Sequence, residues 1–190
     1  MEESYEQHLL RQREEKDEFF ANDPHSPIAP DQRKENFPGL QYFPPDFEYR
    51  FVLPLHKHEE RTEIVVETTT EGEQSYLRWG EFRLEIDDHS ITLQAYKSDP
   101  DASHLWVPFR DETNGEQTYG AGRYLDLSYE DDQHPSGEWV LDFNRAYNPT
   151  CAYNEAYECP LIPMENWLDV AISAGEQTYP LDPVSVEHHH

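Results

Sequence analysis

Short segments in which apolar and polar residues alternate dominate the chain from residue 48 onward. In residues 81–86, for example, Phe82, Leu84 and Ile86 stand between charged neighbours. Such alternation puts the apolar side chains on one face of a β-strand, because successive side chains point to opposite faces. Short strands bounded by turn residues indicate a mainly β fold, an antiparallel sandwich or barrel-like domain. The expected strands are residues 48–55, 62–70, 81–86, 90–96, 104–109, 123–129, 137–143 and 167–172.

The first part of the chain has a different pattern. Residues 2–21 favour an α-helix that is apolar only near its ends, at Tyr5 and Phe20 for example, so the helix is expected to dock on the β-body by those ends. Pro24 stops it. With 190 residues we expect one domain. The expected organisation is an N-terminal helix in 1–25, a single β-rich domain in 26–183 and a purification-tag remnant at 187–190.

The charge balance is strongly acidic, with 40 acidic against 14 basic residues and a formal net charge of −26. A compact chain with this charge repels itself at low ionic strength. Molar salt shortens the Debye length to about 3 Å and screens most of that repulsion. The acidic, lysine-poor composition therefore favours a surface adapted to a salt-rich cytoplasm, although an ordinary acidic protein kept soluble by its charge would have the same composition.

The same composition excludes some partners. Nucleic acid and anionic membranes both need a cationic surface, so we expect neither as a partner. The sequence has no apolar run long enough to span a bilayer and no signal-like start, which makes a cytoplasmic location the expectation. The pattern does not indicate an oligomeric state.

Residues 108–126 contain two of the scarce cations, Arg110 and Arg123, among turn-forming residues and glycines. One interpretation is an arginine pair that binds a carboxylate or phosphate group of a ligand. The other is that each arginine binds a neighbouring acidic side chain. We expect Arg123 to be at least partly buried and therefore to bind an acidic side chain, with Asp126 and Asp142 the nearest candidates.

Residues 142–166 lie between two expected strands and have no hydrophobic period of their own. The segment is rich in Tyr, Asn and Pro, a mixture that suits a pocket for a polar ligand. A loop that satisfies its own polar groups would have the same composition. An irregular segment of this length is usually functional or disordered, and its aromatic residues argue against disorder. We therefore expect it to be ordered and to line a cleft together with Arg123.

Two further groups could carry chemistry. Cys151 and Cys159 could be reduced thiols, a disulfide, or a metal or catalytic pair, and their spacing does not match a zinc knuckle. His56 and His58 share one face of a strand and could bind one metal ion, or simply be a solvated strand end. We expect neither a cofactor nor a metal. No G-x-S-x-G motif for a nucleophilic serine is present.

The sequence resembles the prokaryotic domain-of-unknown-function family 1684 (DUF1684) over nearly its whole length. The most specific part of the resemblance is the run from Asp142 to Glu176, where Ile162, Met164 and Trp167 depart from the family pattern. The other matching residues are Arg13, Lys16, Asp17, Phe19, Phe20, Ser26 and Pro27; Phe37, Gly39, Leu40, Tyr42, Phe43 and Pro44; and Phe109, Asp111, Thr113, Gly115, Thr118, Tyr119, Gly122, Arg123, Tyr124, Leu125 and Asp126.

This resemblance implies a single β-rich domain and supplies no activity. It favours a site over a self-packed loop, because the motif residues are features of the family. The leading hypothesis is a binding domain for a small polar molecule. The residues expected to bind that ligand are Arg110, Tyr119, Arg123, Tyr124, Asp142, Asn144, Tyr147, Asn148, Tyr153 and Asn166.

Two alternatives stay open. The first is a metal-independent hydrolase or lyase that uses Asp142 or Glu165 as general base and Arg123 as the anchor of an anionic substrate. It requires a carboxylate with a raised pKa beside an arginine in a cleft. The second is a structural or interaction protein without a ligand, which should have a flat apolar patch.

Overall fold

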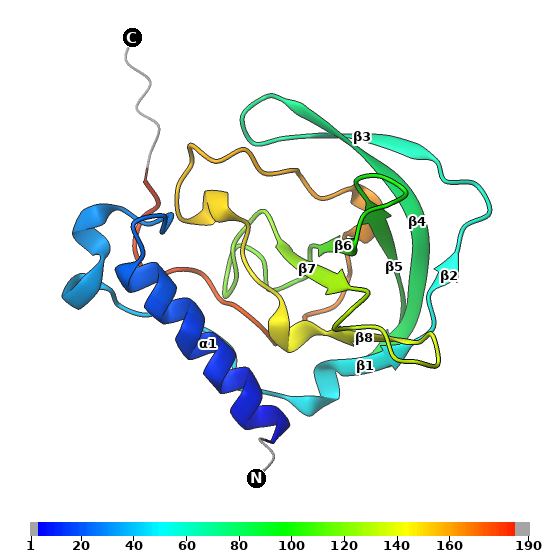
Figure 1. The fold of residues 1–190 in the computed structure, drawn as a ribbon, viewed down its shortest axis with the longest axis horizontal. Coiled ribbons are helices and arrows are strands. Elements are labelled where there is room, and N and C mark those ends of the chain that lie inside the picture. Colours follow the sequence, from blue (N-terminus) through cyan, green and yellow to red (C-terminus); the bar gives the residue numbers. More distant parts are fainter. Residues whose placement is uncertain (1–3, 185–190) are drawn as a thin grey trace.

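The computed structural model describes residues 4–184 and is mainly β, with a single α-helix among those residues. Strands β2 (His56–Lys57), β3 (Glu63–Glu67), β4 (Glu73–Ile86), β5 (His89–Lys97), β6 (His104–Phe109) and β7 (Arg123–Ser128) form one antiparallel sheet. Its order is β2-β4-β5-β6-β7, with β3 also paired to β4. Strands β1 (Arg50–Leu53) and β8 (Trp139–Asp142) form a second, two-stranded antiparallel sheet. The sheets do not close into a barrel, and their arrangement is sandwich-like (Figure 1).

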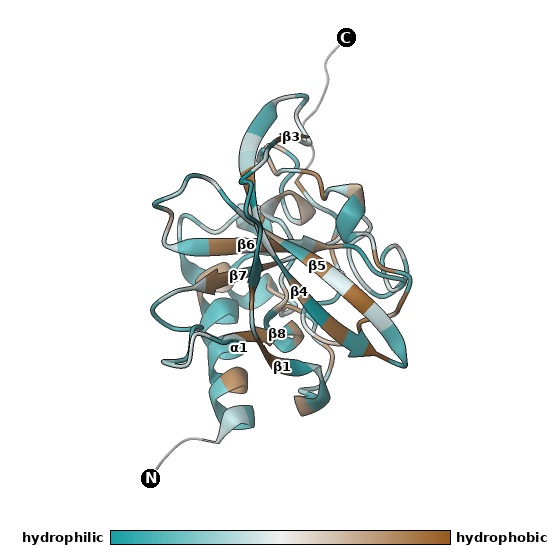
Figure 2. Cartoon of the chain, turned by 90° about the vertical axis from the view of Figure 1, so that its right-hand side faces the viewer, coloured by the Kyte–Doolittle hydropathy of each residue, from teal (hydrophilic) through white to brown (hydrophobic). Residues whose placement is uncertain are grey.

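The alternation seen in the sequence produces the main core. Phe82, Leu84 and Ile86 of β4 pack with the inward residues of β5, β6 and β7, and with Leu141 of β8. Figure 2 shows the resulting hydrophobic and hydrophilic bands along β4 and β5. A second apolar cluster of Tyr96, Trp106, Tyr124 and Ile162 covers the other face of the large sheet. The large sheet is therefore covered on both faces near its centre.

Helix α1 (Tyr5–Asn22) begins at a capping box, in which the Ser4 hydroxyl accepts from the backbone N–H of Gln7 and the Gln7 side chain accepts from the backbone N–H of Ser4. It lies on the opposite side of the molecule from β4 (Figure 1). Lys16 of this helix donates to the buried carboxylate of Glu176 at 3.1 Å. The remaining helical segments are short 3₁₀ turns at Pro30–Gln32, Lys34–Asn36, Phe47–Tyr49, Phe143–Arg145, Thr150–Ala152 and Met164–Asn166.

One expected strand is wrong. Residues 167–172 contain only an isolated bridge between Trp167 and Arg110, and are otherwise irregular. Val170 and Ile172 are nevertheless buried in the main core. The backbone N–H of Ile172 donates to the Asp111 carboxylate at 2.7 Å instead of to a neighbouring strand. The expected tag remnant at 187–190 lies outside the described residues.

Candidate functional site

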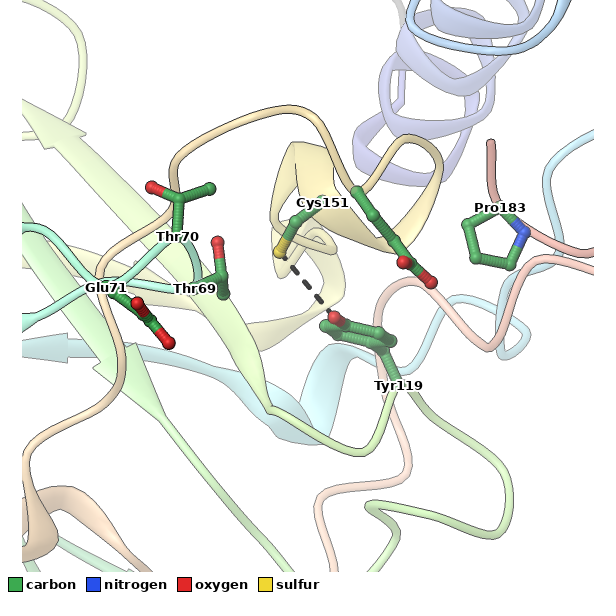
Figure 3. Close-up of a pocket in the computed structure, with 7 residues that line it drawn as sticks. Thr69, Thr70, Glu71, Tyr119, Cys151 and Pro183 are labelled. Carbon is green, nitrogen blue, oxygen red and sulfur yellow. Dashed lines mark hydrogen bonds between the residues drawn. The ribbon is translucent and has the colours of Figure 1, made fainter. Parts of the chain in front are cut away.

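A pocket of about 560 Å³ opens where the turn between β3 and β4 approaches the segment 150–155. Figure 3 shows Thr69, Thr70 and Glu71 on one side of it and Pro183 on the other, with the Tyr119 hydroxyl directed at the Cys151 sulfur. The segments that meet here are far apart in the sequence. The lining residues are Thr69, Thr70, Glu71, Tyr119, Cys151, Glu155 and Pro183.

Backbone hydrogen bonds fix the turn that forms one wall. The N–H of Thr68 donates to the Gly72 carbonyl at 2.9 Å, and the N–H of Gly72 donates to the Thr68 hydroxyl at 3.0 Å. Glu71 has a φ of 65°, in the left-handed region that non-glycine residues adopt only at a cost. The N–H of Thr69 donates to the Cys159 carbonyl at 3.0 Å, which ties the turn to the far end of the cysteine loop.

Cys151 forms the floor of the pocket. Its sulfur lies 3.5 Å from the Tyr119 hydroxyl oxygen, and its backbone N–H donates to the Cys159 sulfur at 3.3 Å. Hydrogen bonds from the Cys159 thiol and the Tyr119 hydroxyl lower the pKa of Cys151 to about 7, against an opposing contribution from burial. Donating its proton to Cys151, together with burial, raises the pKa of Cys159. The two thiols are thus chemically unequal.

Both cysteines are free thiols in this structure, which corresponds to the reduced-thiol interpretation. Among residues 4–184, no group of three or more His, Cys, Asp and Glu side chains is placed to hold a metal ion. His58, on the expected histidine face, instead lies 2.8 Å from the amide oxygen of Gln94.

Tyr119 is the one expected ligand residue that lines this pocket. Arg123 lies in the core with no exposed side-chain surface, so its burial is confirmed and it cannot share an open cleft with residues 144–166. The expected partners Asp126 and Asp142 are wrong. The guanidinium Nη2 lies 3.4 Å from Asp111, and the guanidinium also donates to the carbonyls of Ile172, Ala174 and Glu176.

Asp142 and Asn144 link α1, β8 and the segment before β1 through hydrogen bonds. The Asn144 amide exchanges two hydrogen bonds with the backbone of Asp46, at 2.9 and 2.7 Å, and also donates to Asp142. The other oxygen of Asp142 accepts from the Tyr5 hydroxyl of α1. Both residues are buried with these partners, so neither offers a free polar group to a ligand.

Asn148 and Tyr153 converge on Glu176, which is fully buried. The backbone N–H of Asn148 donates to one carboxylate oxygen at 2.9 Å, and the Tyr153 hydroxyl donates to the other. Together with Lys16 of α1, these donors surround the carboxylate. This cluster holds three distant segments together.

Asn166 occupies a gap in the sheet. Strands β5 and β6 pair at Tyr96 and Trp106, and beside that pair the Asn166 amide hydrogen bonds to the backbone of Gln94 and Pro108. Because it replaces missing ladder bonds, Asn166 is fully buried and out of reach of a ligand. Its expected role in a ligand site is therefore not supported.

The side chains of the proposed general base Glu165 and of the second arginine, Arg110, have partners other than Arg123. Glu165 pairs with Arg78 at 3.1 Å and accepts from the Tyr96 hydroxyl. Arg110 lies over the ring of Trp167, 4.4 Å from its centroid. The two arginines do not converge, because one is in the core and the other stacks near the surface.

The two motifs expected to build the site do meet, at a smaller recess of about 180 Å³. Asp126 and Tyr147 are hydrogen bonded there. Tyr124 is not part of its lining, and its hydroxyl donates to the Pro160 carbonyl. The recess is lined by Leu125, Asp126, Leu127, Asp132, Val140, Asp142, Arg145 and Tyr147.

The sequence reasoning missed most of the larger pocket. Thr69 and Thr70 were assigned to the end of an expected strand, and Glu71, Glu155 and Pro183 were not singled out. A usable signal was the run of threonines followed by an acidic residue and Gly72, which is typical of a tight turn between strands. The sequence contained no signal that this turn meets Cys151.

Comparison with known proteins places the chain in a family. It is 40% identical to an uncharacterized protein from gene locus rrnAC0354 of Haloarcula marismortui, whose solution NMR structure has the same fold with a TM-score of 0.70. The alignment covers 92% of this chain and 94% of that one. No curated protein matches the sequence. None of the helices within residues 4–184 is long and apolar enough to cross a membrane. The family model described as "Protein of unknown function (DUF1684)" matches residues 35–177, and the chain belongs to that family.

Proposed function

We propose that this protein binds a small polar molecule, uncharged or cationic, in the pocket between the β3–β4 turn and Cys151. The observation that carries the proposal is the lining of that pocket, which combines hydroxyl groups and two carboxylates and, among the described residues, has no lysine or arginine. Its volume of about 560 Å³ is in the range of pockets that hold metabolites.

The lining also sets the charge of the ligand. Glu71 and Glu155 are exposed at the rim, and the whole chain has a net charge of −26. An anion would be repelled by both, whereas an amine or a polyol would not. Thr70 and Tyr119 offer hydroxyls, and the Tyr119 ring adds a flat apolar face. This differs from the anionic ligand expected from the arginine pair.

The test is a binding screen on the full chain at about 0.15 M KCl, where the two carboxylates still act on a ligand in the pocket. Polyols and diamines should raise the melting temperature, while citrate and AMP should not. Calorimetric titration of the best ligand should then show weaker binding by Thr70→Val and Glu155→Gln. Glu85→Gln, an exposed change on β4 away from the pocket, is the matched control and should bind as the wild type does. Preferential binding of the anions, or equal binding by all three variants, would refute the proposal.

The carboxylate-and-arginine enzyme has no assembled site to support it. Asp142 is buried against Tyr5 and Asn144, Glu165 pairs with Arg78, and Arg123 is sealed in the core. A general base must reach the proton that it removes, and an anchor must reach the substrate. These three residues satisfy neither requirement together.

A second candidate function, protein–protein contact, is favoured by one observation. Val65, Leu161 and Met164 line an apolar groove beside the edge strand β3, and Val65 and Met164 are 59% and 74% exposed. Exposed apolar patches of this kind often mark interaction surfaces. Light scattering in molar KCl should detect an oligomer that Val65→Lys and Met164→Lys dissociate. A monomer at all concentrations would remove self-association through this groove.

A further inference from the structure

We propose that Cys151 and Cys159 form a redox-active pair, in which Cys151 reacts with a hydroperoxide entering the pocket and Cys159 resolves the product to a disulfide. This goes beyond ligand binding and uses the same pocket. It rests on the position of the two sulfurs and on the different environments of the two thiols.

The two cysteines are buried to a similar degree, and their position relative to the pocket distinguishes them. Cys151 lines the 560 Å³ pocket, and its sulfur faces the Tyr119 hydroxyl (Figure 3). Cys159 does not line this pocket. Thr69 fixes its backbone, because the Cys159 N–H donates to the Thr69 hydroxyl and the Cys159 carbonyl accepts from the Thr69 N–H. A small neutral oxidant in the pocket therefore meets Cys151 first.

The different pKa values of the two thiols also indicate that Cys151 reacts before Cys159. The Cys159 thiol hydrogen bonds to the Cys151 sulfur and lowers the pKa of Cys151, while the pKa of Cys159 itself is raised. The thiolate is the nucleophilic form of cysteine. Cys151 is thus the thiol that ionises near neutral pH. Tyr119 contributes a second hydrogen bond to its sulfur.

The chemistry balances without a metal or cofactor. The Cys151 thiolate attacks one oxygen of the hydroperoxide, an S–O bond forms, the O–O bond breaks, and the departing oxide takes a proton from solvent. The Cys159 sulfur then attacks the sulfenic sulfur, the S–O bond breaks, and the hydroxyl leaves as water with the Cys159 proton. The two thiols lose two electrons and two protons, and two external thiols reverse the reaction by exchange.

The second step requires the sulfurs to be close. The Cys159 sulfur accepts from the backbone N–H of Cys151 at 3.3 Å, which places it beside the Cys151 residue. The two cysteines are fixed by different segments, Cys151 by Tyr119 and Cys159 by Thr69 of the β3–β4 turn, and Thr69 also contributes to the environment of the Cys151 thiol. The resolving thiol is therefore in place before the oxidant arrives.

The test uses the full chain, reduced and freed of reductant, in molar KCl with a chelator. Hydrogen peroxide at one to two equivalents should remove both thiols of the wild type and lower its intact mass by about two hydrogens. Cys159→Ser should stop at a sulfenic acid that dimedone traps on Cys151. Cys151→Ser should keep its remaining thiol at the same dose. Peptide mapping separates oxidation of the exposed Met164, which adds one oxygen elsewhere.

A pH profile supplies an independent readout. The rate of iodoacetamide alkylation at Cys151 should have its midpoint near pH 7, and Tyr119→Phe should move that midpoint upward by removing a hydrogen bond to the thiolate. Circular dichroism verifies that each variant is folded. Loss of Cys159 reactivity in Cys151→Ser with retained structure supports the order of events.

Three results would overturn the proposal: wild-type thiols that survive peroxide, a Cys159 that oxidises equally well without Cys151, or a midpoint at the value of an ordinary thiol, about 8.5. These outcomes are separate from those of the ligand screen. Cys159→Ser, at a residue outside the pocket lining, should bind a ligand as the wild type does while failing to form the disulfide, whereas Glu155→Gln should form the disulfide and bind the ligand more weakly.

Discussion

Arg123 and Cys151 are two polar side chains of one β-domain whose environments differ in the number of hydrogen-bonding partners and in access to a pocket. Around Arg123 the hydrogen-bonding partners are numerous: the two Nη atoms contact Asp111 and three backbone carbonyls, Nε has no partner among the described residues, and none of the side chain is exposed. Around Cys151 the partners are weaker and fewer, and a pocket of about 560 Å³ stays open beside the sulfur.

This difference distinguishes a residue that stabilises the fold from a residue that can react. A buried charge surrounded by hydrogen-bonding partners is structural, because removing any partner leaves an uncompensated group in the core. A thiol that shares hydrogen bonds with another thiol and a hydroxyl can still change its protonation and react. Both environments draw on residues of the family motifs, so membership of a motif does not by itself indicate a ligand site.

The largest effect expected is that of salt on the exposed carboxylates, because salt acts on the whole excess of negative charge. The wild-type melting temperature should rise between dilute buffer and molar KCl as repulsion is screened. Glu71 and Glu155 at the pocket belong to this screened class, and the sealed Asp111 does not. A melting temperature that stays flat or falls, measured by calorimetry, would remove the salt-adapted interpretation of the surface.

Arg123→Met tests the fully buried environment, that of Arg123. It should lower the free energy of unfolding by about 3–5 kcal/mol, because Asp111 is left buried without its cation and carbonyls lose their donors. The matched control is Arg110→Met, which removes a cation–π contact over Trp167 and should cost about 1 kcal/mol or less. Urea unfolding in molar KCl measures both. Equal losses would mean that the burial of Arg123 has no special energetic weight.

Tyr153→Phe tests whether the Glu176 cluster is sealed from water in the way that the Arg123 environment is. The lost hydroxyl leaves a fully buried carboxylate oxygen without its donor, so a loss of about 1–3 kcal/mol is expected. Tyr157→Phe, at a tyrosine that is 43% exposed, should change stability by less than about 0.5 kcal/mol. If the two substitutions cost the same, Glu176 is hydrated and the cluster is not sealed.

Much of this arrangement could be predicted from local sequence. Alternation identified the inward faces of β4, β5, β6 and β7, and the cost of a lone guanidinium predicted that a buried Arg123 has a carboxylate partner. Strand pairing could also have identified that partner. Phe109 of β6 pairs with Arg123 of β7, so Asp111, two residues beyond Phe109, lies near the same end of the sheet.

Other features depend on contacts that no local pattern encodes. Val170 and Ile172 alternate because they face the core, yet their segment hydrogen bonds to the backbone of residues 110–112, beyond the end of β6, and to the Asp111 side chain. The sequence did not predict the first half of β4. There Tyr76 packs against the second apolar cluster, so apolar and polar residues do not strictly alternate. The pocket itself brings Thr69 to Cys151 across most of the domain, through the fold of the β3–β4 hairpin.

Glu81→Gln should have the smallest effect, and it shows how a pair with one exposed member, Arg83, differs from the fully buried ones. A hydrogen bond from Arg83, at 2.8 Å, holds the pKa of Glu81 below its ordinary value of 4.5, and Gln94 adds a second donor. A carboxyl whose pKa is lower in the folded state stabilises that state above the unfolded pKa. The contribution disappears as the pH falls through the folded pKa. Because the Arg83 side chain is 60% exposed, about 0.5 kcal/mol at pH 7 in dilute buffer is expected.

That small increment should vanish under two conditions that leave the sealed groups unchanged. Below the folded pKa, Glu81 is protonated and the wild type and Glu81→Gln become equally stable. In molar KCl the exposed pair is screened, and the difference disappears at pH 7 as well. The cost of Tyr153→Phe should persist in the same salt, because its hydroxyl and the Glu176 carboxylate are buried. Unfolding of both variants across pH and salt measures this contrast. A Glu81 effect that survives molar KCl would show that burial alone does not decide which polar groups stabilise this fold.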